Sequence, residues 1–139
     1  MKKVLRRYLL VTVIITCLTC GTAYAYNFPF MSNQAPRSMA TVEGSLSTLD
    51  VSCYSTLCGA SLWNKSGSNR YLSVGVWAYD ANGSLINLDT GSGVKANGSG
   101  VSATVGTQNG DKAVGQGKIY NGTSSSSGVA ETLNNSVNK

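Results

Sequence analysis

A strictly alternating segment followed by an Asn-Gly turn constrains the fold of this chain most. From Arg70 to Asp80, aliphatic residues occupy every second position, and aromatic or small residues occupy the positions between them. Successive side chains of a β-strand point to opposite faces of its sheet, so this period predicts a half-buried strand. Asn82-Gly83 follows directly, and Asn-Gly between alternating segments is a strong indication of a β-hairpin. Antiparallel sheet is therefore expected here.

The same turn chemistry recurs along the chain. Asn-Gly dipeptides stand at residues 82–83, 97–98, 109–110 and 121–122, a spacing typical of successive hairpin turns with strands between them. Helix formers such as Glu, Gln and Met are sparse, and the 16 glycines disfavour helix further. We therefore predict an all-β fold, a small antiparallel β-sandwich or rolled meander of about six to eight strands.

Alternation elsewhere in the sequence predicts further strands and a core. Strands are expected over residues 41–49, 57–64, 84–88, 100–107 and 114–120. Their aliphatic sides should pack together between the sheets. The expected core includes Val42, Leu46, Leu62, Leu72, Val74, Val76, Ile86, Leu88, Val101 and Val105.

The first 25 residues have the three parts of an export signal. Four basic residues lie within the first seven positions, an apolar stretch follows, and Ala23-Tyr24-Ala25 has the small-x-small pattern that signal peptidase cleaves. The apolar stretch from Tyr8 to Leu18 is shorter than the about 20 residues that a membrane-spanning helix needs. The sequence thus predicts a signal peptide over residues 1–25, a secreted bacterial protein, and no membrane span after cleavage.

Three parts are expected in the mature chain. Residues 26–40 hold both prolines and show no period, which favours a flexible N-terminal arm, with a docking segment or a propeptide as the alternatives. Residues 41–121 carry the alternation and should form the β-sandwich domain. Residues 122–139 begin with a Gly- and Ser-rich run of flexible composition and are expected to form a Ser-rich tail. Within that tail, residues 129–133 are candidates for an edge strand or a helical turn.

Two cysteines remain after cleavage of the signal peptide. Cys53 and Cys58 enclose four residues, and a pair of cysteines in an exported chain typically forms a disulfide. Redox-active pairs usually enclose two residues instead. A zinc site would need further thiolate or imidazole ligands, and the chain has no His. We predict a structural disulfide between Cys53 and Cys58.

The charge of the mature chain argues against nucleic acid as a partner. The whole chain has a formal net charge of +5, but four of its eleven basic residues lie in the signal peptide, which leaves seven against six acidic residues. These seven are scattered singly, whereas nucleic-acid binding depends on clustered Lys and Arg. We therefore expect no nucleic-acid partner.

Patterns for catalysis and metal binding are missing from the sequence. Without His there is no Ser-His or Cys-His pair, and no glycine loop for phosphate is present. Among the carboxylates, Asp80 and Asp89 flank one predicted hairpin and are the candidate acid pair of a small hydrolase. Aspartates in turns commonly bond the local backbone instead, and the dense Asp pattern of a calcium loop is missing. We predict no enzyme, no metal site and no cofactor.

Three aromatic residues share one side of the strand that begins at Arg70. Tyr71, Trp77 and Tyr79 should lie opposite the aliphatic row, and exposed Tyr and Trp combine apolar area with a polar group, as binding surfaces do. The alternative is that a second layer covers this face. We expect a secreted extracellular binding or surface-interaction protein without catalysis, whose partner is a cell-surface glycan or a protein. A secreted bacteriocin or toxin-like antagonist and a small hydrolase are the alternative functions.

Overall fold

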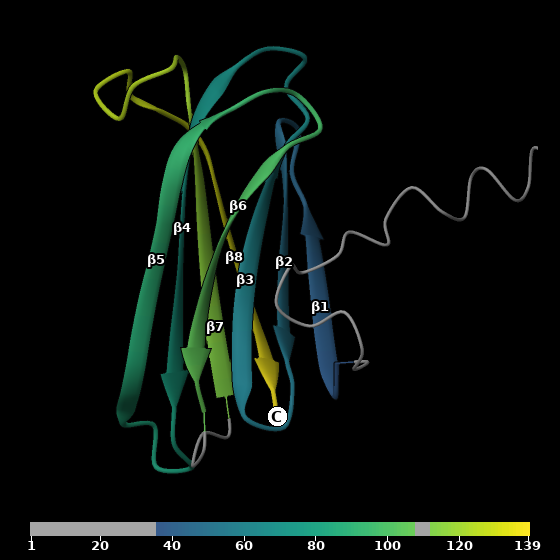
Figure 1. Cartoon of the computed structure of the whole chain (residues 1–139), viewed down its shortest axis with the longest axis vertical. Helices are drawn as coiled ribbons and strands as arrows, with labels where there is room; N and C mark the ends of the chain where they lie inside the picture. The colour runs from purple at the N-terminus through teal and green to yellow at the C-terminus, as the bar shows by residue number, and fades with distance from the viewer. Residues whose placement is uncertain (1–35, 108–111) are drawn as a thin grey trace, which may run out of the picture. The chain divides into compact units, whose positions relative to one another are not determined.

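The alternating segment at the centre of the sequence forms an inner strand of one sheet. The computed structural model describes residues 36–107 and 112–139, and in it β4 (Arg70–Tyr79) lies between β5 (Leu85–Lys95) and β7 (Lys112–Tyr120) (Figure 1). β8 (Val129–Asn138) pairs with β7, and all pairs are antiparallel. The sheet therefore has the order β5-β4-β7-β8.

A second antiparallel sheet has the order β1-β2-β3-β6. Its strands are β1 (Ser38–Glu43), β2 (Ser47–Cys53), β3 (Leu57–Asn64) and β6 (Gly100–Gly106). β3 and β6 are neighbours although the β4–β5 hairpin separates them in sequence, so the chain crosses between the sheets before and after that hairpin. The predicted all-β sandwich is confirmed. In the described residues there is no helix, and so none that is long and apolar enough to cross a membrane.

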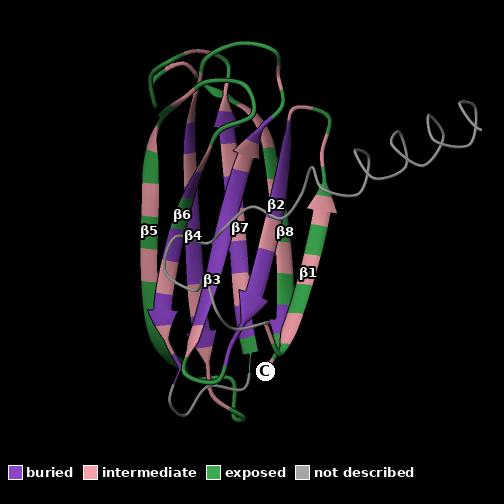
Figure 2. Cartoon of the chain, turned by 45° about the vertical axis from the view of Figure 1, so that its right-hand side comes forward, coloured by how far each residue is buried: buried purple, intermediate pink, exposed green. Residues whose placement is uncertain are grey.

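The core lies between the two sheets (Figure 2). Six residues of the expected core are buried there, and each contributes about 1.5–3 kcal/mol by leaving water: Leu62, Leu72, Val74, Val76, Val101 and Val105. Val42 and Leu46 are partly buried and pack against this cluster. The inward side of β7 includes Gly115 and Gly117, where an added Cβ would come within 2.5 Å of Val51 and Leu62 respectively. These glycines let the two sheets approach closely.

Two residues of the expected core lie on the surface instead. Ile86 and Leu88 of β5 are 42% and 51% exposed. Leu88 pairs with Trp77, so both side chains point outward, and a register shift at Tyr79 disturbs the alternation of β5 beside Ile86. The inward positions of β5 hold Asn87 and Asp89. The aliphatic side of β5 is therefore its outer side, opposite to the expectation.

The turns also differ in detail from those expected. The strand predicted over residues 41–49 is broken at Gly44, whose N–H donates to the carbonyl of Ser47 at 2.8 Å and closes the β1–β2 turn. Of the Asn-Gly dipeptides, residues 82–83 form a hairpin turn, but only the glycine has a positive φ, so the turn is not of type I′. Residues 97–98 connect two sheets, and residues 109–110 lie outside the described ranges.

Both ends of the sandwich extend past the expected domain limits. β1 begins at Ser38, inside the segment expected to be an arm, and β8 occupies most of the expected tail. Ten residues, Val129–Asn138, form β8 despite their polar composition: on its inward side Leu133 and Val137 pack against the core, and Glu131 bonds the β1–β2 turn. The predicted signal peptide, residues 1–25, and the arm up to residue 35 lie outside the described residues.

The predicted disulfide is present. Cys53 and Cys58 are cross-strand partners at the end of the β2–β3 hairpin, with their Cα atoms 4.1 Å apart. Both side chains are buried in the core cluster. The bond therefore fixes the register of this hairpin at the point where the chain reverses.

Candidate binding surface

The outer side of the β5-β4-β7-β8 sheet carries the aromatic residues that the sequence indicated. The inward row of β4, Leu72 to Ala78, is at most 1% exposed. Tyr71, Trp77 and Tyr79 therefore point away from the core, and each is half-buried. We call the outward-facing side chains of β5, β4 and β7 the aromatic face.

Trp77 lies in an apolar row at one end of the aromatic face. Its cross-strand partners are Leu88 and Val114, and Leu88 is 51% exposed. The six-membered part of the indole lies over Gly75 of the same strand, where an added Cβ would come within 2.6 Å of the ring. The ring therefore leans along the strand rather than standing out from the sheet. One side of it covers the strand backbone at Gly75, and the residue as a whole is half-buried.

The two tryptophans of the chain differ in how their indole N–H groups are used. Trp63, on the outer side of the other sheet, donates to a carboxylate oxygen of Asp50 at 3.1 Å. Within the described residues, the indole N–H of Trp77 makes no hydrogen bond. Its nitrogen is not one of the buried side-chain polar atoms that lack a partner. A buried Trp N–H usually has a partner, so a donor that no described residue engages is available to a ligand acceptor.

Tyr71 lies at the opposite end of β4 in a second aromatic pair. Its ring contacts Tyr120 edge to face, with ring centres 5.3 Å apart, and its hydroxyl lies 3.0 Å from the Ser92 hydroxyl. Val94, its cross-strand partner, is 50% exposed. This second cluster is therefore held in place by contacts across three strands.

Tyr79 borders an open hollow at the hairpin end of the sheet. The hollow has a volume of about 670 Å³ and is lined by Tyr79, Asp80, Lys112 and Val114, among others. Trp77 and Tyr79 are two positions apart on the same side of β4, so the apolar row leads directly into the hollow.

Between the two aromatic clusters the face is polar and carries no carboxylate. The rows across the middle of β5, β4 and β7 hold hydroxyl, amide and glycine residues with one lysine: Ser92, Ser73, Lys118, Thr90, Gly75 and Gln116. Gln116 also donates to Asn134 of β8 at 2.9 Å. Neutral hydrogen-bonding groups thus separate the aromatic ends.

The two candidate acids of a hydrolase both bond the backbone. One carboxylate oxygen of Asp80 accepts the N–H groups of Asn82 and Ser84 at 2.9 and 2.8 Å, which closes the β4–β5 hairpin. Asp89 accepts the N–H of Thr104 at 2.9 Å and so joins β5 to β6 of the other sheet. Asp80 and Asp89 are therefore structural groups in these contacts. No three His, Cys, Asp or Glu side chains within residues 36–107 and 112–139 lie close enough to hold a metal ion.

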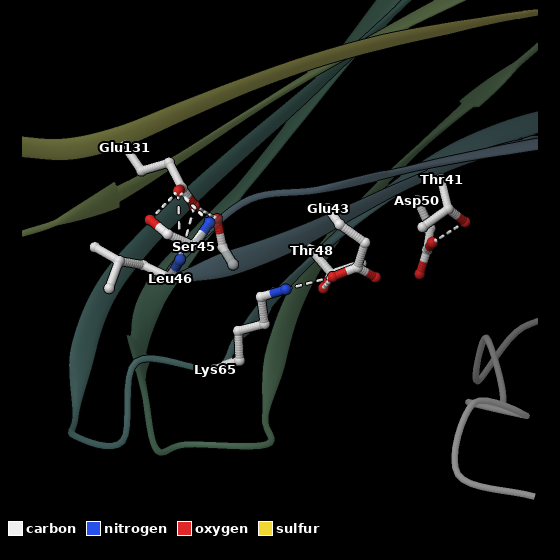
Figure 3. Close-up of polar contacts among 9 residues, drawn as sticks. Thr41, Glu43, Ser45, Leu46, Thr48, Asp50, Lys65 and Glu131 are labelled. Carbon is white, nitrogen blue, oxygen red and sulfur yellow. Dashed lines mark hydrogen bonds and ion pairs between the residues drawn. The ribbon is translucent and has the colours of Figure 1, made fainter. Parts of the chain in front are cut away.

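Glu131 has the most elaborate set of contacts of any described carboxylate, and nothing in the sequence indicated it. From β8 it accepts hydrogen bonds from the hydroxyls of Ser45 and Ser47, at 2.8 and 2.6 Å, and from the N–H groups of Ser45 and Leu46 (Figure 3). Gly44 completes the cradle, since a Cβ there would come within 2.3 Å of the carboxylate. Burial raises the pKa of Glu131, but these hydrogen bonds outweigh it and hold the pKa below its usual value.

A neighbouring carboxylate, Glu43, is engaged more loosely. It bonds the Thr48 hydroxyl at 2.8 Å and forms an ion pair with Lys65, and the bond to Lys65 is the main cause of a pKa below the usual value (Figure 3). Glu43 and Asp50 both lie on the β1-β2-β3-β6 sheet. These two carboxylates therefore belong to the sheet opposite the aromatic face, whereas Asp80 lines the hollow beside Tyr79.

The fold and this surface together define a class of protein: a small disulfide-linked β-sandwich with one aromatic, carboxylate-free sheet face. No protein-family model, curated protein or solved structure matches the chain.

Proposed function

We propose that this protein is a secreted, non-catalytic binding module that attaches to the surface of cells through the aromatic face. The observation that carries the proposal is Trp77, whose ring leans over Gly75 and whose N–H is used by no described residue. Aromatic anchors with an unengaged polar atom are typical of the centres of binding sites. The exposed Leu88 and the half-buried Val114 extend the apolar contact on both sides.

The balance of charge favours contact by stacking and apolar burial. With a mature net charge near zero, attraction over long distances is weak, so affinity must come from groups that touch the partner. Truncation of a central aromatic anchor typically costs about 2 kcal/mol or more of binding free energy, which is roughly a thirtyfold loss of affinity.

The test is adsorption of the mature chain to intact bacterial cells. Wild type, Trp77→Ala and Trp63→Ala are titrated against washed cells, and the unbound protein is measured. We expect Trp77→Ala to weaken adsorption roughly thirtyfold. Trp63→Ala is the matched control, because it removes the same side chain from the other sheet. It should leave adsorption unchanged as long as circular dichroism shows the native spectrum.

The proposal is contradicted if wild type and Trp77→Ala adsorb equally. It is also contradicted if neither of them adsorbs. Loss of adsorption in Trp63→Ala alone would move the binding surface to the β1-β2-β3-β6 sheet, and this also contradicts it.

A further inference from the structure

We infer that the partner of the aromatic face is a linear polysaccharide, an inference that rests on the proposed function and adds the chemical class of the ligand. Sugar rings have an apolar side formed by C–H groups and a rim of hydroxyls. A surface that binds a chain of them therefore needs aromatic rings for stacking and neutral hydrogen-bonding groups beside those rings. The aromatic face offers both in one continuous strip.

The spacing of the aromatic residues fits a chain rather than a single sugar. Tyr71 and Trp77 are six residues apart on one strand, or about 20 Å, and Tyr79 extends the series by about 7 Å. A ligand that contacts all three must be extended. The strip follows β4, so the polysaccharide would lie along the strand direction.

The polar centre of the strip disfavours a protein as the partner. Protein interfaces usually have an apolar core and a polar rim. Here the order is reversed, because Ser73, Ser92 and Thr90 lie between the Tyr71 and Trp77 clusters. Hydroxyl and amide groups in that position can donate to and accept from sugar hydroxyls, and the unengaged N–H of Trp77 adds one more donor.

The charge of the strip disfavours a nucleic acid. Single strands also stack on aromatic residues, but each bound phosphate calls for a nearby cation. On the aromatic face the described lysines are Lys112 and Lys118, both on β7. Two cations along a strip of about 26 Å are too few for a polyanion of that length.

The experiment uses cells to which wild-type protein adsorbs and removes one class of surface polymer at a time. Periodate, which cleaves the vicinal diols of sugars, should lower adsorption at least about tenfold, and protease digestion should leave it unchanged. Raising NaCl from about 0.05 to about 0.5 M should change the affinity less than about threefold. Adsorption that is lost on protease digestion, kept after periodate, or lost in high salt overturns the inference. The proposed function would stand in each of these cases, because it depends only on the Trp77 variant.

A glycine variant tests the stacking geometry without deleting an aromatic ring. In Gly75→Ala the new methyl group would come within 2.6 Å of the Trp77 ring and must displace it. We expect at least about a tenfold loss of affinity for the periodate-sensitive polysaccharide purified from the walls of the same cells. Gly106→Ala is the matched control, because a Cβ there would have no neighbouring atom within 4 Å. Equal binding by these two variants would overturn the assignment of Trp77 as the stacking residue.

Discussion

The side chains of β4 divide into two sets with different roles. Val76 is fully buried between the sheets, while Trp77 is half-buried on the aromatic face. Alternation alone identified both sets correctly, because the period of a strand depends on local geometry and not on distant parts of the chain. The alternative that a second layer covers the aromatic side finds no support among the described strands, all of which lie in the two sheets.

The first prediction compares these two neighbours. Val76→Ala should lower the free energy of unfolding by about 2–3 kcal/mol, because it leaves a cavity between the sheets. Trp77→Ala should lower it by about 1 kcal/mol or less, since the side chain packs only against the outside of its own sheet. Urea denaturation of both variants measures the difference. A larger loss for Trp77→Ala than for Val76→Ala would show that the outer side of the sheet is the one that stabilises the fold.

The second prediction concerns Glu131. Replacing it with Gln removes the charge and leaves one oxygen in place of the two that accept hydrogen bonds from Ser45, Leu46 and Ser47. Hydrogen bonds to a charged group contribute about 1.5–3 kcal/mol, so Glu131→Gln should lose about that much stability at neutral pH. Glu43→Gln is the matched control, because the side chain of Glu43 is 54% exposed and exposed ion pairs contribute about 0–1 kcal/mol.

The same carboxylate gives a pH dependence with a defined sign. The pKa of Glu131 in the folded protein lies below its unfolded value, which is near the usual value of about 4.3. Its contribution to stability is therefore complete above pH of about 5 and is lost as the pH falls through the folded pKa. The difference in unfolding free energy between wild type and Glu131→Gln should shrink below pH of about 4. A difference that grows on acidification would contradict this assignment.

At the scale of whole elements, β4 was easy to predict and β5 and β8 were not. β4 has an aliphatic row on one side over its full length. β5 belongs to the edge of a sheet, and its inward positions are polar or glycine because they meet β6 rather than the centre of the core. The aliphatic side of β5 faces outward because Leu88 pairs with Trp77. The sequence does not reveal this register.

The candidate surface was predictable only as far as it lies on β4, because alternation within one strand reveals which residues share a side. Tyr71, Trp77 and Tyr79 belong to one strand and follow from its period. Tyr120 and Val114 join them only because β7 pairs with β4, although β7 is distant in sequence. The Asn-Gly spacing suggested consecutive hairpins and so could not predict this pairing.

The third prediction tests β8, the edge strand that lies within the expected tail and begins with the candidate strand residues 129–133. A chain ending at Gly128 would leave one edge of β7 unpaired and uncover Ile119 and Ala113, both fully buried in the intact protein. We expect it to show no cooperative thermal unfolding. A chain ending at Asn138 keeps all of β8 and should melt like the wild type. A sharp transition in the shorter chain would mean that β8 is dispensable.

The fourth prediction concerns the disulfide of the β2–β3 hairpin. Replacing Cys53 and Cys58 together by Ser should cost about 2 kcal/mol, the value expected for a loop of this length, plus the cost of placing two hydroxyls in an apolar site. The double variant should still fold, because the bond closes a short local loop. The wild type is unfolded chemically with and without reductant, in parallel with the double variant. A free energy of unfolding that does not change on reduction would contradict the prediction.

Over the whole molecule, each pair of facing sheet edges is joined by a carboxylate. Glu131 connects β8 to the turn between β1 and β2, and Asp89 connects β5 to β6. Both bonds link the two sheets outside their strand pairing, so they oppose separation of the sheets at their margins. Core packing and these two edge contacts therefore hold the sandwich together by different means.

The contact between Glu131 and Ser45 also dictates when the protein can fold. It joins residues 86 positions apart in sequence, and β8, which supplies it, comes last in chain order among the described strands. Until β8 is synthesised, β7 lacks a neighbour and the β1–β2 turn lacks its carboxylate, so only local hairpins can form. Folds dominated by such distant pairings are slow to form. The order of the strands thus delays closure of the sandwich until β8 has been synthesised, because both the β7 edge and the β1–β2 turn wait for it.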